Sequence, residues 1–517
     1  MLTYLYLGVF FSGLVTLAAE TAAARLIGNY FGSSNLVWAS IIGLILLYLT
    51  AGYTIGGRWA DRMPKLEVFF KILAWGGLLI GFIPLAARPI LRFASQAFDQ
   101  FQLGVLFGSF VSILILFSAP VILLGCATPF AMRIAGQDNP QLGKVAGRLN
   151  AISTLGAFIG TFLPSLVLIP LVGTYLTFVL MGGMLLCIAL FCVWKTKGYR
   201  YALPLLWMPL LLAVSAWLGL RGRDKIAQGL LYEGESAYNY IQVQEQQGYY
   251  LLRLNEGQGV HSIYHPQQIN YRGPWEQVLV APFFNSAPYD PENVQRIAIL
   301  GLAAGTTARQ ANLVFPDAVI DGFEIDSRII AVGRSYFALD ETKVNIFIED
   351  ARSGLQRSPH LYQIISVDAY KPPYIPWHLT TLEFFQTTYD HLSEDGVLVV
   401  NVARIFDDYR LVNALATTIS EVFPSIYLCD LPDTFNTVLF ASKQPTHAEN
   451  LLQNYTWLEA HGFSTDLLLP TMHITIIKAT QEFLPSMVLT DDKAPVEWLT
   501  NAMLVDFVLG GGFEELQ

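Results

Sequence analysis

Long apolar stretches dominate the first part of the chain. Seven of them, each about 20 residues long, cover 4–24, 36–57, 67–87, 104–125, 149–171, 174–194 and 201–220. A helix needs about 20 apolar residues to cross the hydrocarbon of a membrane, so the pattern predicts a seven-span bundle over 1–220. Gly156 and Gly160, in the fifth stretch, are spaced to let another helix backbone approach closely.

The pattern changes period after these stretches. From 232 to 275, apolar and polar residues alternate in short runs separated by glycine, which predicts a small antiparallel β-hairpin region within 221–290. From 291 to 517, apolar runs alternate with helical stretches, which is typical of an α/β fold with a mostly parallel, doubly wound sheet. The expected strands are 296–300, 318–323, 344–348, 364–367, 397–402 and 437–441.

Charge divides the chain at the same place. Residues 1–220 contain 13 Lys and Arg against 5 Asp and Glu, whereas 221–517 contain 18 against 36, so the two parts carry formal charges of +8 and −18. With 53% apolar residues, the chain is neither wholly soluble nor disordered, and we expect a lipid bilayer around its first part. The acidic second part argues against nucleic acid as a partner, and the four cysteines show no metal-binding spacing, so no metal is expected.

One carboxylate interrupts the first apolar stretch. Glu20 is costly to ionise in lipid unless it meets a cation, such as Arg25 or Arg148, or lines a polar cavity. Two interpretations stay open for this membrane polar site: a substrate or proton site, and a structural pair between helices.

Small and acidic residues follow the expected strands of the last region. The first strand ends in 301–305, where Gly301 and Gly305 bound a turn of small residues that lets a ligand approach the backbone. The second ends at Glu324, 23 residues after Gly301. That is near the spacing of about 20 at which a carboxylate accepts from the hydroxyls of an adenosine ribose.

The next two strands also end in carboxylates. Asp350 and Ala351 follow the third strand, where a carboxylate can accept from the exocyclic amine of adenine, and Asp368 follows the fourth. A single Asp in such a place is most often a helix N-cap. Acidic ends on three successive strands favour a nucleoside site, because ligands of such sheets bind at the carboxyl ends of the strands.

These residues resemble the polyamine aminopropyltransferases, of which spermidine synthase is the type, and among them the bacterial members fused to a multi-span membrane domain. The similarity covers roughly 230–445. It is carried by SAYN at 236–239, LNEG at 254–257, WE at 275–276, the glycine turn, EID at 324–326, EDA at 349–351 and YQIISVDAY at 362–370, with TDDKAPVE at 490–497 near the C-terminus.

The resemblance implies a Rossmann-like catalytic domain over 291–517 that moves an aminopropyl group from decarboxylated S-adenosylmethionine to a small amine and releases methylthioadenosine. Asp368 matches the catalytic carboxylate, which positions or deprotonates the amine. The implied cofactor-binding residues are Asn239, Gly301, Gly305, Glu324, Asp350 and Ala351, and the implied substrate-binding residues are Tyr238, Glu276, Tyr370, Asp491 and Asp492. We also expect a homodimer, located in the bacterial inner membrane.

Two arguments disagree about the side of the membrane. Loops after the second, fourth and sixth stretches carry nine cations and the opposite set carries six, which favours a cytoplasmic N-terminus. Seven spans would then place 221–517 outside. A domain that uses a cytosolic adenosyl compound should face the cytosol, and we expect the cytoplasmic placement on that ground.

The sequence also departs from the family pattern, mainly where a polyamine would bind. Ala304 and Lys371 stand where the family carries acidic residues, Asn239 replaces a Gln, and Trp275 replaces a His. A lysine beside a polyamine would repel it by about 1 kcal/mol or more in a partly buried cleft. The proline-rich stretch 372–378 is expected to form a rigid loop that could cover the cleft.

Three hypotheses therefore stay open. The first is aminopropyl transfer to a polyamine or another amine. The second is a methyltransferase that uses intact S-adenosylmethionine, whose carboxylate or acidic substrate could meet Lys371. The third is a non-catalytic nucleoside-sensing module coupled to a transporter-like membrane half. Fold similarity alone does not decide among them.

Overall fold

The computed structural model describes residues 2–32, 35–101, 104–137, 141–219, 227–255, 259–370, 374–405, 407–432, 434–463 and 466–509. The chain folds into two compact units, 1–226 and 227–517. Lys371, which distinguishes the chain from the family pattern, lies outside the described residues, as do Pro372 and Pro373.

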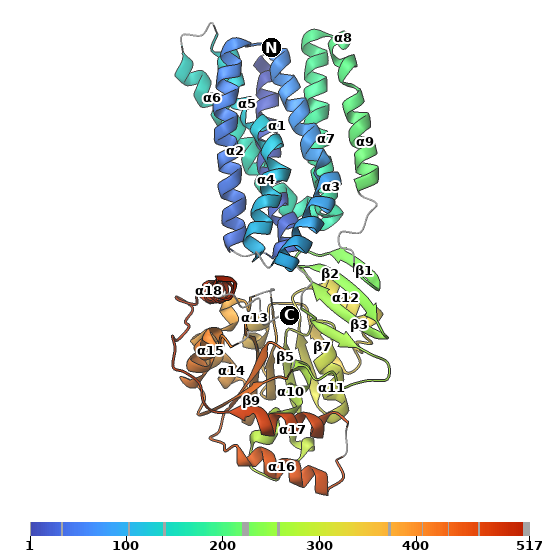
Figure 1. Ribbon diagram of the computed structural model, residues 1–517, viewed down its shortest axis with the longest axis vertical. Helices are drawn as coiled ribbons and strands as arrows, with labels where there is room; N and C mark the ends of the chain where they lie inside the picture. Colours follow the sequence, from blue (N-terminus) through green and yellow to red (C-terminus); the bar gives the residue numbers. More distant parts are fainter. Residues whose placement is uncertain are drawn as a thin grey trace. The chain divides into compact units, whose positions relative to one another are not determined.

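Helices joined by short connections form the described part of the first unit (Figure 1). They are α1 (Leu2–Phe31), α2 (Asn35–Arg62), α3 (Leu66–Phe101), α4 (Gly104–Gly125), α5 (Ala127–Ala135), α6 (Leu142–Leu163), η1 (Pro164–Leu168), α7 (Ile169–Lys197), α8 (Tyr199–Ala202), η2 (Leu203–Leu205) and α9 (Trp207–Gly219). Within the described ranges, six helices are long and apolar enough to cross a membrane, one of them a 56-residue run at Leu142–Lys197. The expected count was seven. The difference arises at Gly173, whose non-helical dihedrals (φ 80°, ψ 169°) interrupt that run between the fifth and sixth expected stretches.

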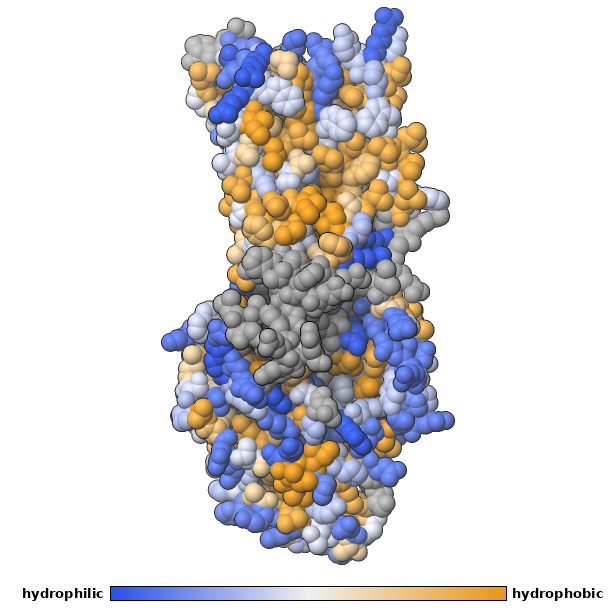
Figure 2. All heavy atoms as spheres, in the orientation of Figure 1, coloured by the Kyte–Doolittle hydropathy of each residue, from blue (hydrophilic) through white to orange (hydrophobic). Residues whose placement is uncertain are grey.

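Glycines bring helices of this unit into backbone contact. A Cβ atom on Gly156 would lie 2.1 Å from the carbonyl oxygen of Phe10, and one on Gly160 would lie 2.0 Å from that of Leu14. Helices α1 and α6 therefore meet along the face that the glycine spacing predicted. Figure 2 shows hydrophobic side chains over the outside of this unit. Leu46, Phe158 and Leu171 are among those exposed by more than half.

The second unit begins with a small antiparallel sheet. Its strands are β1 (Leu230–Glu235), β2 (Tyr240–Gln246), β3 (Tyr249–Leu254) and β4 (Ser262–Tyr264), paired in sequence order. This is the hairpin region that the period-two pattern predicted. Ile241 and Val243 of β2 and Leu252 of β3 pack against Ile329 of the α/β part, so the small sheet shares a core with it.

An eight-stranded sheet forms the centre of the second unit (Figure 1). Its order is β12 (Ala479–Thr480), β10 (Ser425–Asp430), β11 (Asn436–Ser442), β9 (Leu392–Ala403), β8 (Tyr362–Val367), β5 (Arg296–Leu300), β6 (Val319–Phe323) and β7 (Val344–Phe347). The five strands from β9 to β7 are parallel, whereas β11 runs antiparallel to β9 and β10. All six expected strands are present, and β10 and β12 are additional.

Helices cover both faces of this sheet. They are α10 (Pro274–Gln277), η3 (Val278–Phe284), η4 (Pro291–Asn293), α11 (Thr306–Val314), α12 (Ser327–Tyr336), α13 (Ala351–Arg357), η5 (Trp377–Leu379), α14 (Leu382–Asp390), α15 (Arg410–Ser420), α16 (Glu449–Ala460), α17 (Leu468–Lys478) and α18 (Val496–Leu509). Along β5, Ile297 and Ile299 face a core with η3, α11, α16 and α17. Ala298 and Leu300 face the other core, with α13, α14, α15 and α18, so the sheet is doubly covered as expected.

Candidate functional site

The parallel strands end at one edge of the sheet, in register. Leu300 at the end of β5 pairs with Phe323 of β6 and Val367 of β8. The backbone ladder continues one step further, because Asp368 N donates to Leu300 O at 3.0 Å and Glu324 N donates to Phe347 O at 3.0 Å. The carboxyl-bearing residues that follow β6, β7 and β8 are therefore carried to a common edge.

The glycine turn after β5 packs against the end of β8. Gly301 has a φ of 95°, and a Cβ atom there would lie 2.6 Å from the carbonyl oxygen of Asp368. Gly305 has a φ of 91° and is the N-cap of α11. Both conformations favour glycine because an L side chain rarely adopts them. The absence of side chains thus brings the turn within contact distance of Asp368.

Glu324 is fixed against this turn. Its Oε2 accepts from Ala303 N and its Oε1 from Asp326 N, both at 3.0 Å. The side chain is buried, and burial raises the pKa of Glu324 to about 7, although the two backbone hydrogen bonds act in the opposite direction. The carboxylate expected to take the ribose is therefore held in one orientation next to the backbone that would carry the nucleoside.

Asn239 joins the small sheet to the end of β6. Its Nδ2 donates to Asp326 Oδ2 at 3.0 Å, and its Oδ1 accepts from Asn255 Nδ2 at 3.0 Å. Ser236 Oγ donates to the same Asp326 oxygen at 2.5 Å. The neighbouring Tyr238 is 49% exposed. The amide of Asn239 is thus already engaged by the protein.

Asp350 caps α13 and contacts a histidine. Its Oδ1 accepts from Ser353 N at 2.9 Å, which is the N-cap arrangement, and Ala351 begins the helix. Its Oδ2 lies 2.8 Å from His378 Nε2. The hydrogen bond from His378 is the largest cause that lowers the pKa of Asp350, to about 2. Asp350 is therefore an ionised acceptor across the physiological range.

Asp368 is held by Asn401, which is held in turn by Asn436. Asn401 Nδ2 donates to Asp368 Oδ1 at 2.8 Å, and Asn436 Nδ2 donates to Asn401 Oδ1 at 2.9 Å. Tyr370 stands behind Asn401, with its hydroxyl donating to Asn401 O at 3.0 Å. Burial raises the pKa of Asp368, and the hydrogen bond from Asn401 opposes that shift. Among the described residues, no hydrogen-bond donor contacts Asp368 Oδ2.

Two other expected residues have structural partners. Glu276 is 1% exposed and accepts from Tyr271 N, Gly273 N and Gln310 Nε2 at 2.6 to 2.9 Å. Asp491 accepts from both terminal nitrogens of Arg352, each at 2.7 Å. No hydrogen bond between described residues joins Glu276 to Asp350, Glu324 or Asp368, whereas Arg352 links Asp491 to the carbonyl oxygen of His378, the partner of Asp350.

The remaining expected residues lie further from this cluster in the chain. Asp492 is exposed in the turn before α18, and Glu20 is half-buried in α1 of the first unit. The part of the chain that the structure describes contains no group of three or more His, Cys, Asp and Glu placed to hold a metal ion. The substrate-binding roles expected for Tyr238, Glu276, Tyr370, Asp491 and Asp492 stay predictions.

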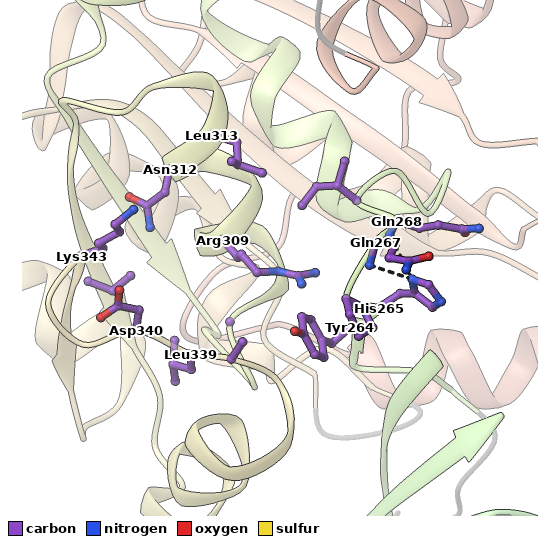
Figure 3. Close-up of a pocket in the computed structure, with 15 residues that line it drawn as sticks. Tyr264, His265, Gln267, Gln268, Arg309, Asn312, Leu313, Leu339, Asp340 and Lys343 are labelled. Carbon is purple, nitrogen blue, oxygen red and sulfur yellow. Dashed lines mark hydrogen bonds between the residues drawn. The ribbon is translucent and has the colours of Figure 1, made fainter. Parts of the chain in front are cut away.

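A separate cavity of about 370 Å³ lies beside α11 (Figure 3). Of the expected site residues, only Gly305 lines it. Its central cation, Arg309, is 4.5 Å from the ring centre of Tyr264 and donates to Tyr271 and to Ile263 O. Arg309 is thus used to hold the small sheet against α11, and the cavity does not include the carboxylates of the strand ends.

Part of the second unit is similar to known proteins. Residues 285–454 match the family model described as "Spermine/spermidine synthase domain". A probable polyamine aminopropyl transferase of Bifidobacterium longum (strain NCC 2705) is 35% identical over 223 residues, which cover 43% of this chain and 48% of that protein. The match thus spans about half the length of this curated relative.

A longer match in sequence covers most of the chain. Polyamine aminopropyltransferase 2 of Aquifex aeolicus (strain VF5) is 22% identical over 466 residues, or 87% of this chain and 89% of that protein. The crystal structure of a probable spermidine synthase from Corynebacterium glutamicum ATCC 13032 aligns with 51% of this chain and 98% of its own, at 21% identity and a TM-score of 0.39. The family-model match covers residues 285–454, so this similarity to spermine/spermidine synthases lies in the second unit.

Proposed function

We propose that the chain is a membrane-anchored transferase that moves an aminopropyl group from decarboxylated S-adenosylmethionine to an amine and releases methylthioadenosine. The domain match and the printed names of the relatives support this reaction class. The single observation that carries it is the row of carboxylates after β6, β7 and β8, in which Asn401 donates to Asp368 Oδ1 and no described residue donates to Asp368 Oδ2.

The reaction needs an uncharged amine and a fixed sulfonium compound. The amine nitrogen attacks the aminopropyl carbon next to sulfur, a C–N bond forms, and the C–S electron pair returns to sulfur as methylthioadenosine leaves. The new ammonium then releases a proton. Because burial raises the pKa of Asp368, its carboxylate is a stronger base than a solvent-exposed one and supports that transfer.

The nucleoside would bind next to Asp368, at the same edge of the sheet. In this proposal Glu324 accepts from the ribose hydroxyls, Asp350 accepts from the adenine amine, and Gly301 allows the sulfonium end to approach the backbone. The position of each residue at the carboxyl end of its strand supports these proposed roles. We further propose that the apolar helices anchor the first unit in a bilayer, with the second unit in the cytosol.

The test is product formation by the full-length chain in detergent or nanodiscs. Supplied with decarboxylated S-adenosylmethionine and a panel of diamines and polyamines, the protein should form methylthioadenosine together with the aminopropylated amine. With intact S-adenosylmethionine and the same amines it should form no S-adenosylhomocysteine. Formation of S-adenosylhomocysteine, or no product from any amine, contradicts the proposal.

A further inference from the structure

His378 gives the proposed purine end of the site a second fixed partner. The residue lies in η5, and its Nε2 is 2.8 Å from Asp350 Oδ2. Ser353 N already holds the other oxygen at 2.9 Å. An ionised carboxylate offers about four lone-pair sites. Asp350 can therefore still accept from a ligand, but only in the directions that these two donors leave open.

The contact with His378 exceeds what a helix cap needs. An N-cap Asp needs only one oxygen, here Oδ1, to accept from the helix backbone. Its second oxygen can then accept from water. The terminal torsion of an Asp side chain is soft, so a carboxylate held by one donor samples a broad range of directions. With His378 on Oδ2, Asp350 is held at both oxygens.

The segment around His378 is itself fastened to the fold. The carbonyl oxygen of His378 accepts from Arg352 Nη1 at 3.1 Å. Arg352 forms two hydrogen bonds with Asp491, and the fully buried Thr381 donates to the same Asp491 at 2.7 Å. The imidazole is therefore positioned by contacts on both sides of η5, from α13 and from the turn before α18.

The pair also remains accessible to a ligand. The side chains of His378 and Asp350 are 31% and 32% exposed. A pair that only stabilised the packing of η5 on α13 could be closed to solvent, whereas this one presents polar atoms at the sheet edge where Glu324 and Asp368 also lie.

We propose that His378 is a positioning residue for nucleoside selection. By holding Oδ2, it aims the remaining acceptor of Asp350 at an exocyclic amine, so that the site binds a 6-aminopurine nucleoside in preference to the same nucleoside without the amine. The inference rests on the proposed function, because that function places adenine at Asp350. It assigns a role to a residue that lies ten positions after the proposed catalytic carboxylate.

Two nucleosides and three variants test this inference on the full-length chain. The probes are methylthioadenosine and its 6-deamino analogue, which carries hydrogen in place of the amine, and calorimetry gives the affinity of each. The variants are His378→Phe, which cannot donate, His378→Gln, whose amide can donate to the same oxygen, and His360→Phe as a control at an exposed histidine.

The wild-type chain should prefer methylthioadenosine by at least about tenfold, the effect of one hydrogen bond to a charged acceptor. His378→Phe should lose most of that preference, while His378→Gln and His360→Phe should keep it. The preference ratio is informative because a loss of folded protein would lower both affinities together and leave their ratio unchanged.

Each result decides between the two proposals. If the wild-type chain shows the preference and His378→Phe retains it, or if His378→Gln loses it as fully as His378→Phe, the role of His378 is wrong while the proposed function stands. If the wild-type chain binds neither nucleoside, the proposed function fails and this inference fails with it.

Discussion

The two units achieve close packing in opposite ways. In the helical unit, α1 and α6 touch through backbone atoms because Gly156 and Gly160 carry no side chains. In the α/β unit, strands such as β5 place large side chains into cores on both faces, and the backbone is satisfied by neighbouring strands. Small residues are thus structural in the first unit. In the second, the close contact that Gly301 permits lies at the sheet edge, against the carbonyl oxygen of Asp368.

Two carboxylates within the second unit differ in how many hydrogen bonds they accept from the protein. Glu276 accepts three hydrogen bonds and is 1% exposed, so its acceptor capacity is largely used by the fold. Among the described residues, Asp368 accepts one side-chain hydrogen bond, from Asn401. A carboxylate with unused lone pairs at the end of a parallel strand is a better candidate for chemistry than a saturated one.

The largest expected effect comes from Asp368. Asp368→Asn should lower kcat for methylthioadenosine formation by about a hundredfold or more, because an amide cannot accept the proton of the attacking amine. The affinity for methylthioadenosine should stay within a few-fold of wild type. Asp317→Asn, at an exposed position, is the matched control. Activity near the wild-type level in Asp368→Asn would show that Asp368 is not the base.

The next effect tests the glycine contact of the helical unit. Gly160→Ala should destabilise that unit by about 1 to 3 kcal/mol, because the added Cβ would overlap the carbonyl oxygen of Leu14. Gly147→Ala in the same helix meets no atom within 4 Å and should be neutral or stabilising. Thermal unfolding in detergent compares the two. Equal melting temperatures would mean that α1 and α6 do not approach as closely as described.

A pH profile tests the role of Glu324. Burial raises its pKa to about 7 from 4.5, so its contribution to stability is full below about pH 4.5 and is lost as the pH rises through about 7. Ribose hydroxyls need the ionised form as acceptor. Methylthioadenosine should therefore bind about tenfold more tightly at pH 8 than at pH 6, the change expected from one titrating group.

The pH dependence of the affinity for methylthioadenosine should be absent in Glu324→Gln and present in Asp368→Asn. Asp350, with a pKa of about 2, stays ionised over this range and adds no slope. If the affinity of the wild-type chain for methylthioadenosine does not change with pH, Glu324 does not bind the nucleoside.

The smallest effect concerns Asp491. The ion pair with Arg352 is partly exposed, so Asp491→Asn should lower stability by about 1 kcal/mol or less. KM for the amine should not change if the carboxylate is only structural. Steady-state kinetics and thermal unfolding give both values. A large rise in KM with unchanged stability would instead support the substrate-binding role that the sequence suggested.

Much of the fold follows from the periodicity of the sequence, and the exceptions have physical causes. The run at 296–300 is a buried strand with the expected bounds, because continuous apolar runs of this length suit a parallel sheet. The strand at Ser425–Asp430 was not predicted, since a short apolar run after a helix has no period that separates strand from helix. The two-residue strand at Ala479–Thr480 carries no pattern at all.

The candidate site was less predictable, because several of its partners are distant in sequence. Asn401 reaches Asp368 only because β9 lies beside β8, and Asn436 reaches Asn401 only because β11 pairs with β9. Neither amide differs from an ordinary strand residue in the sequence. The pairing of Asp491 with Arg352, 139 residues away, is likewise a consequence of tertiary packing.

The most direct test of the central claim is an experimental structure of the full-length chain with methylthioadenosine. The ribose hydroxyls should lie within hydrogen-bonding distance of Glu324 and the adenine amine within that of Asp350, with the sulfur facing Asp368. A nucleoside bound elsewhere, such as in the cavity beside Arg309, or one that contacts none of these three carboxylates, would contradict it.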